Sequence, residues 1–465
     1  MNSLIFNLNK ITIVGLLSFS ALSSFNSNAQ SLEEAVAEAL HSHPDIRQSF
    51  ARFKSKEEEV NRASSGYFPT IDLTAGYGYE YTDTPANRRS SADSETELAR
   101  GEFGISIKQI LFDGLYTSNE VDRTMFEASA EQWTLIADAE DLALQVSKAY
   151  LNFIKTDALI KLSEKNIASH QDIYSQIKER TDSGLGSIAD LSQVTGRLAR
   201  AQSNMVSARN NHRDARTQFI RLTNSQPENL VLPVPDADML PKDSSEGLNL
   251  AIKHHPVIKS AKQDINAARS FKSAVKSNYY PKLSLELAAN SDNDIAGESG
   301  INTLGTDVGG HRNDATAMLR LRYNFYSGGK DIANERSAAY KVSEAQEINY
   351  SAHRQVTESY GLAWNAFEML GLQKKYIKQH IIASKDTQLA YKQQFDIGQR
   401  NLLDLLDTEN ELFQARKDYL DASFNELSAR YRLLNATGQL LASLRVTRSS
   451  AWKGEHEYEQ GAYNE

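Results

Sequence analysis

The sequence predicts a mainly α-helical chain that also carries two β-hairpins, with long helices that pair as coiled coils. Three observations support this fold class. One unit of about 210 residues occurs twice, proline is missing from two very long stretches, and four short segments alternate apolar with polar residues. The chain is therefore predicted to be two copies of one mixed unit rather than several unrelated domains.

The duplication is visible in matched motifs at a constant spacing. His43-Pro44 matches His255-Pro256, and Phe68-Pro69 matches Tyr280-Pro281, each 212 residues further along the chain. A proline after an aromatic residue marks the point where a helix gives way to an extended segment. Each copy is therefore expected to run helix, strand, loop, strand, long helix, turn, long helix.

The ends of the chain and the region between the copies differ from the repeats. Lys10, the apolar run 11–22 and the small residues at 27–29 are typical of a secretory signal peptide, and the apolar run is too short to span a bilayer. The expected parts are a signal peptide at 1–29, a first repeat at 30–226, an inter-repeat linker or equatorial region at 227–247, a second repeat at 248–446, and a polar, flexible C-terminal tail at 447–465.

Long helices are expected where proline is absent. No proline occurs between 86 and 226 or after 281. Near the C-terminus an apolar residue recurs every seven positions, which is the coiled-coil pattern, at Phe413, Leu420, Leu427 and Leu434. The predicted long helices cover about 116–182, 187–224, 331–395 and 401–445. A helix of 65 residues is about 98 Å long, so an elongated molecule is expected.

Strands are expected where apolar and polar residues alternate. The pattern predicts strands at about 70–81, 102–111, 282–288 and 316–326. Their apolar positions are rich in aromatic residues, whereas the alternate positions carry acids, lysine and arginine. The polar stretches between paired strands, about 82–101 and 288–315, are expected to be exposed loops.

Composition excludes several functional classes. The net charge of −9 argues against nucleic-acid binding. Cysteine is absent, so disulfides and thiol chemistry are excluded. No phosphate-binding loop, HExxH or GxSxG motif occurs, so we expect neither an enzyme nor a cofactor. The two His-Pro motifs lie in different repeats without an acidic cluster, so a turn between two short helical pieces is favoured over a metal site.

The strands have the length and pattern of membrane-spanning β-strands. About 9–11 residues suffice for a tilted strand to cross a bilayer, and an exported chain without apolar helices can cross only as a closed barrel. Four strands cannot close one, since single-chain barrels begin at about eight strands. Two chains would supply eight strands and three would supply twelve, enough for a water-filled interior. A soluble periplasmic coiled-coil scaffold is the alternative, but it does not account for the tyrosine-rich strands.

The full ordered set of features resembles the TolC family of outer-membrane channel proteins. The resemblance covers nearly all of 31–446 and rests on the duplication, the paired His-Pro and aromatic-Pro motifs, the Phe112-Asp113-Gly114 turn and the Gly-x₅-Asp turns between long helices. It implies a homotrimer with a twelve-stranded outer-membrane β-barrel standing on an α-helical periplasmic barrel. It also implies contact with outer-membrane lipid, and partnership with a periplasmic adaptor (membrane fusion) protein and an inner-membrane pump.

The same resemblance implies roles for residues at the turns between the long helices. Arg400 matches the family's gate arginine, Asp404 and Asp407 its pore-lining aspartates, Phe395 its gate aromatic residue, and Asp190 the acidic partner of the arginine. Positions 404 and 407 lie on one helix face, and three chains would place six carboxylates around a constriction that favours cations.

A purely structural interpretation of these residues remains open. The segments 187–190 and 401–404 both fit helix-capping patterns, and an acid in a first helical turn is favoured by the helix dipole. Asp407 lies beyond the first turn, so capping does not explain it. Gly184 and Gly398 are explained by turn geometry, although the resemblance implies that the adaptor contacts these two turns.

The cargo has two candidate classes. One is protein export by a type I secretion system with an inner-membrane ABC transporter, in which the cargo could be a large adhesin. The other is multidrug efflux with a proton-driven RND pump. The long polar loops and the turn sequence 398–404 resemble the secretion branch more closely.

Overall fold

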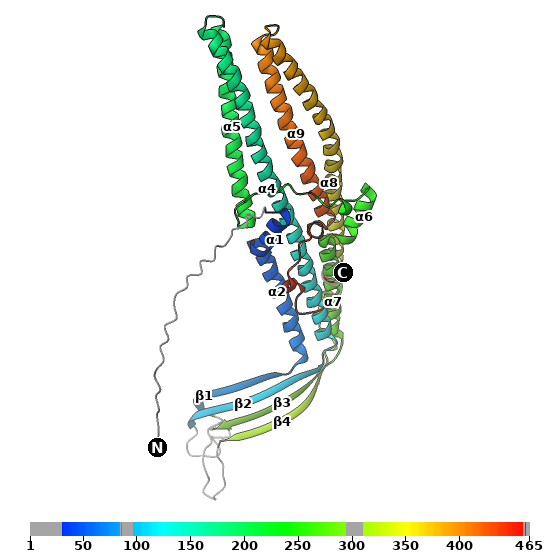
Figure 1. The fold of residues 1–465 in the computed structure, drawn as a ribbon. Helices are drawn as coiled ribbons and strands as arrows, with labels where there is room; N and C mark the ends of the chain where they lie inside the picture. Colours follow the sequence, from blue (N-terminus) through cyan, green and yellow to red (C-terminus); the bar gives the residue numbers. More distant parts are fainter. Residues whose placement is uncertain (1–29, 84, 86–95, 294–309, 459–460, 462–465) are drawn as a thin grey trace, which may run out of the picture.

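The chain is an elongated molecule with a β-sheet at one end and two helical hairpins at the other (Figure 1). The computed structural model describes residues 30–83, 85, 96–293, 310–458 and 461. The predicted signal peptide at 1–29 and most of both predicted loops lie outside these residues. Within the described ranges, no helix combines the length and the apolar character needed to cross a bilayer.

The two repeats have the same element order, and their corresponding helices have nearly the same lengths. The first contains α1 (Leu32–Ser42), α2 (Pro44–Ser64), β1 (Thr70–Thr82), β2 (Thr96–Phe112), α4 (Tyr116–Asp182) and α5 (Ile188–Thr223). The second contains α6 (Ser244–His254), α7 (Pro256–Lys276), β3 (Lys282–Asn293), β4 (Arg312–Arg322), α8 (Lys330–Asp396) and α9 (Leu402–Ala436). Helices α4 and α8 each have 67 residues and are therefore about 100 Å long.

The helices form one continuous layer that extends away from the sheet (Figure 1). Helix α2 packs against α4, α4 against α7, and α7 against α8. Further from the sheet, α5 folds back along α4 and α9 folds back along α8, which makes the two hairpins at the far end (Figure 1).

The His-Pro motifs form the predicted turns between short helices. His43 and His255 are the N-cap residues of α2 and α7, and their Nδ1 atoms accept hydrogen bonds from the backbone N–H groups of Asp45 and Val257, both at 3.3 Å. Proline follows at the first helical position, where its missing N–H costs nothing. Burial lowers the pKa of His255 to about 4, so this imidazole stays neutral and remains an acceptor.

The four strands form one antiparallel sheet in the order β1-β2-β3-β4. Strand β2 begins at 96 rather than 102, and β3 continues to 293 rather than 288, because cross-strand pairing extends past the end of the apolar alternation. Strand β4 is shifted toward the N-terminus and ends at 322 rather than 326. Its last pair is Lys282 with Arg322, immediately after Pro281, where β3 begins.

The last long helix is shorter than the sequence predicts. Helix α9 ends at Ala436, and a separate short helix, α10 (Leu440–Ser443), follows it. Gly438 adopts a φ of 70°, and the N–H of Gln439 returns to the carbonyl of Leu434 at 3.0 Å. This is a Schellman-type termination, which ends the helix although the apolar pattern continues.

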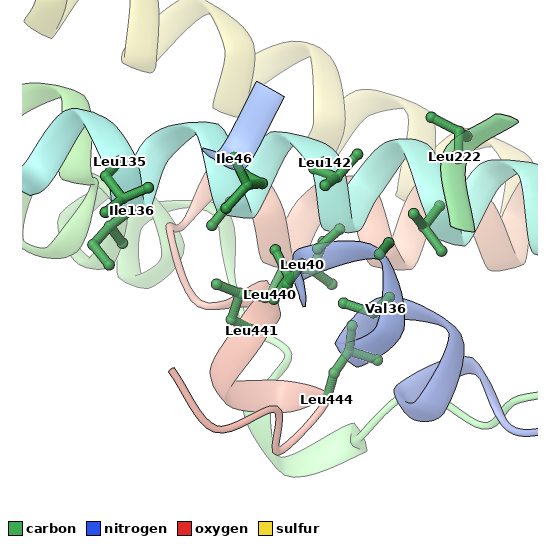
Figure 2. Close-up of a cluster of buried hydrophobic side chains, with 14 of the residues drawn as sticks. Val36, Leu40, Ile46, Leu135, Ile136, Leu142, Leu222, Leu440, Leu441 and Leu444 are labelled. Carbon is green, nitrogen blue, oxygen red and sulfur yellow. The ribbon is translucent and has the colours of Figure 1, made fainter. Parts of the chain in front are cut away.

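The main core lies midway along the molecule, where α1 and α10 pack on α4 (Figure 2). Glu140 of α4 is buried within this core, and its carboxylate accepts hydrogen bonds from the backbone N–H groups of Leu440 at 3.0 Å and Leu441 at 3.2 Å. These hydrogen bonds therefore fasten the start of α10 to the longest helix of the first repeat.

The segment after Val446 is ordered against this core, in contrast to the flexible tail expected from its polarity. Trp452 and Tyr458 are buried, and the Tyr458 hydroxyl donates to the buried carboxylate of Glu57 at 2.8 Å. The side chain of Gln132 donates to the carbonyl of Trp452 at 2.9 Å. Two aromatic anchors and a buried carboxylate thus hold a segment whose average composition is polar.

Candidate functional site

The far ends of the two helical hairpins hold the residues singled out from the sequence. Gly184 and Gly398 close the turns after α4 and α8, with φ values of 74° and 77°. The N–H groups of Leu185 and Gln399 return to carbonyls five residues earlier, at 2.9 Å and 2.8 Å. Glycine is required here because a side chain is strained at positive φ.

The helix that follows each turn begins with a side-chain cap. Ser187 accepts a hydrogen bond from the N–H of Ala189 at 3.1 Å, and Asn401 accepts one from the N–H of Asp404 at 2.8 Å. Asp190 and Asp404 each stand in the first turn, where the helix dipole favours an acid. The neighbouring Ser and Asn side chains do the capping, which leaves both carboxylates available for other contacts.

Arg400 is held within its own hairpin. Its guanidinium donates to Asp404 at 3.2 Å and to Gln394 at 2.9 Å, and it lies 4.2 Å from the centre of the Tyr391 ring. Among the residues that the structure describes, no ion pair joins Arg400 to Asp190 within this chain. Tyr391 and Gln394 were not singled out from the sequence; their signal is that they precede the turn on α8 and lie within reach of its arginine.

Asp407 joins the two hairpins. Its carboxylate accepts from the guanidinium of Arg197 on α5 at 2.7 Å. Sequence reasoning missed Arg197, although it lies seven residues after Asp190 and therefore on the same face of α5. This ion pair crosses from the first repeat to the second.

Phe395 is buried rather than presented to open space. Only 5% of its surface is exposed, and Arg180 of α4 lies over its ring at 5.2 Å. It belongs to a small apolar cluster, separate from the main core, made of residues from both hairpins: Ile173, Ile177, Val194, Phe395, Leu402, Leu405 and Leu406. The ring therefore packs the two hairpins together near their ends.

Two ion pairs lie near the far ends of the hairpins, one within a hairpin and one between the two hairpins. Asp404 pairs with Arg400 of its own hairpin, whereas Asp407 pairs with Arg197 of the other hairpin. In the described part of the chain, no group of three or more His, Asp or Glu side chains is placed to hold a metal ion. Because the Arg197–Asp407 pair joins the two hairpins, a change in their spacing would break it.

The duplicated hairpins, the sheet with one polar face and the charged hairpin ends define a subunit of an elongated membrane channel. The family model described as "Outer membrane efflux protein" matches residues 35–225 and 247–439, one segment in each repeat. The chain belongs to this family, and the predicted resemblance is confirmed. It is a non-enzymatic transport protein of the outer membrane that extends into the periplasm.

Named relatives span almost the whole chain. Outer membrane efflux protein BepC of Brucella suis is 26% identical over 443 residues, covering 95% of this chain and 93% of the relative. Outer membrane protein TolC of Escherichia coli K12 is 25% identical over 435 residues, covering 91% and 85%. The CmeC outer membrane channel of Campylobacter jejuni superimposes with a TM-score of 0.75 at 16% identity, covering 94% of each chain. The predicted mainly helical fold with β-strands is confirmed.

Proposed function

We propose that this chain forms a homotrimeric channel-tunnel, with twelve strands closing a barrel in the outer membrane and the long helices forming a tube in the periplasm. The observation that carries the proposal is the single four-stranded sheet, in which β1 and β4 pair on one side only. Its apolar face is exposed, with Ile71, Leu73 and Leu321 each about two-thirds exposed. Lipid-exposed strands require a closed sheet, which one chain cannot supply.

The hairpin ends form the periplasmic entrance in this proposal. Asp404, Asp407, Arg400 and Asp190 act as gate residues, and the packing of Phe395 determines how closely the two hairpins approach. The turns at Gly184 and Gly398 contact the periplasmic adaptor. Support comes from apolar side chains beside these glycines that nothing covers in the single chain: Leu185 is 86% exposed and Ile397 is 69% exposed.

For the cargo, we favour protein export by a type I secretion system, with an adaptor and an inner-membrane ABC transporter as partners and a large adhesin as a candidate substrate. The turn sequence 398–404 supports this choice. The alternative is the outer-membrane component of a multidrug efflux pump driven by an RND transporter. The names of relatives that include efflux proteins, such as BepC and the cation efflux protein CusC, support the alternative.

Two measurements test the proposal. The detergent-extracted protein is reconstituted in a planar bilayer, where discrete cation-selective steps from a trimer are expected; protein that stays in the soluble fraction and never inserts would favour a periplasmic scaffold. The chain is then expressed in a host that lacks its own channel, together with an ABC transporter, its adaptor and their protein substrate. Restored secretion of the substrate supports type I export, whereas restored drug resistance without secretion supports efflux.

A further inference from the structure

A cavity of about 420 Å³ lies where the sheet meets the helices, between the end of α2, the start of α4 and the helix-proximal ends of β2, β3 and β4. Four basic residues line it: Arg62, Lys108, Lys282 and Arg322. They come from four separate elements, so the tertiary structure alone brings them together. Only two acids, Asp113 and Glu120, share the lining.

The strand register concentrates these charges on one face. Lys282 and Arg322 are direct cross-strand partners, and Lys108 stands opposite Glu286 on the adjacent pair of strands. Cross-strand partners point to the same side of a sheet, and like charges placed directly opposite each other are destabilising. The Lys282–Arg322 pair therefore carries an electrostatic cost that an anion between the two side chains would remove.

The acids near the cavity are already engaged elsewhere. Asp113 accepts hydrogen bonds from both the N–H and the hydroxyl of Thr117, at 2.9 Å and 2.5 Å. Glu120 is bound by two nitrogens of Arg123, at 2.8 Å and 2.6 Å, and this hydrogen bonding lowers its pKa. Glu120 also interacts electrostatically with Arg62. The hydrogen bonds of both carboxylates, however, go to Thr117 and Arg123 and not to the four basic residues.

The remaining acid of the neighbouring strand does not neutralise the cavity either. Glu286 binds Arg320 at 2.7 Å, while Lys108 lies 3.9 Å from it, at the limit of an ion pair. Lys282 lies 6.0 Å from the centre of the Tyr116 ring, a weak cation–π contact. Across the described residues, Arg322 has no ion pair. Two lysines and two arginines thus retain free hydrogen-bond donors toward one cavity.

We propose that this cavity binds a multiply charged phosphate-bearing anion. Arginine matches phosphate oxygens with two parallel N–H donors, and lysine adds a compact charge. A cavity of about 420 Å³ admits more than one phosphate group. Because the lining strand positions lie on the charged face of the sheet, the site opens to the channel interior; this orientation, but not the binding itself, rests on the proposed channel function.

The test is calorimetric titration of the full-length, detergent-purified protein with sodium tripolyphosphate. We expect saturable binding that weakens as salt is raised from 0.1 to 0.5 M. Lys108→Gln and Arg322→Gln should each weaken the affinity by about tenfold or more. The matched control is Arg312→Gln, which removes one positive charge from the same strand and face as Arg322, ten residues or about 33 Å away. Its affinity should equal that of the wild type.

Three further results decide the proposal. Tripolyphosphate should raise the thermal unfolding temperature of the wild type but not of Arg322→Gln, while the unliganded variant should be at least as stable as the wild type, since a like-charge pair is relieved. Unchanged affinity in both pocket variants, or an equal loss in the control, would overturn the site. Tripolyphosphate titration in phosphatidylcholine vesicles with and without phosphatidylglycerol shows where the bound phosphate group comes from. Weaker tripolyphosphate binding in the presence of the anionic lipid identifies a lipid headgroup as the ligand. Equal tripolyphosphate affinities in the two kinds of vesicle identify a soluble anion. A channel that fails to conduct leaves these binding results intact.

Discussion

The Arg197–Asp407 ion pair is expected to hold the two hairpins together at the proposed channel entrance. The Arg197 side chain is 25% exposed and the Asp407 side chain 57%, with 2.7 Å between nitrogen and oxygen. Solvent screening limits such a pair to about 0.5–1 kcal/mol. Three copies in a trimer would contribute about 1.5–3 kcal/mol, which is a factor of about 10 to 150 in the ratio of closed to open channels.

Arg197→Gln should therefore raise the resting open probability in planar-bilayer recordings by about that factor. Asp407→Asn should do the same, and the double variant should add little, because either change removes the same interaction. The difference from the wild type should shrink at 1 M salt, where the Debye length is about 3 Å. The matched control is Arg209→Gln, which removes an exposed arginine further along α5. Additive effects of the two single changes, or an equal effect of the control, would show that this ion pair does not hold the hairpins together.

Four further outcomes are expected. Asp404→Ala combined with Asp407→Ala should weaken block by multivalent cations in bilayer recordings, since it removes the carboxylates of the proposed ring; unchanged block contradicts the ring. Arg400→Ser should raise resting conductance, and wild-type conductance would make Arg400 a surface charge only. Tyr458→Phe should lower the free energy of unfolding by about 1–3 kcal/mol, because it removes a hydrogen bond to a buried carboxylate, and thermal unfolding in detergent measures this loss. Burial raises the pKa of Glu140 from 4.5 to about 7, so the folded state holds the extra proton and the free energy of unfolding should fall by at most about 3 kcal/mol as pH rises from 4.5 to 7. Glu140→Gln should flatten this pH dependence, and an unchanged slope would contradict it.

The fold was accessible from the sequence where local chemistry decides structure. Proline after histidine or an aromatic residue, glycine at a helix end and an alternating apolar strand each act through a few neighbouring residues. Because the chain repeats them, each copy supports the interpretation of the other. Helix α4 was therefore predicted with the bounds that the structure has.

The sequence-based predictions are wrong where residues far apart in the chain determine the local structure. Residues 96–101 lack the apolar alternation, but they form strand β2 because the end of β1 offers them backbone hydrogen bonds. Residues 450–458 are polar on average, yet Trp452 and Tyr458 find a buried site on the first repeat, hundreds of residues away. No local pattern contains that information.

The candidate site likewise has some features that the sequence predicts and others that depend on the packing of the two hairpins. The resemblance to the family singled out Arg400, Asp404 and Asp407 at the second turn, and their spacing placed the two aspartates on one helix face. The pairing of Asp407 with Arg197 and the burial of Phe395 required both hairpins, since each contact joins one repeat to the other. The basic cavity depends on tertiary structure still more, because its four basic residues meet only when two strand registers and the position of helix α2 are specified together. The sequence thus determined the elements and their order, and the packing of the two repeats decided which charges face each other.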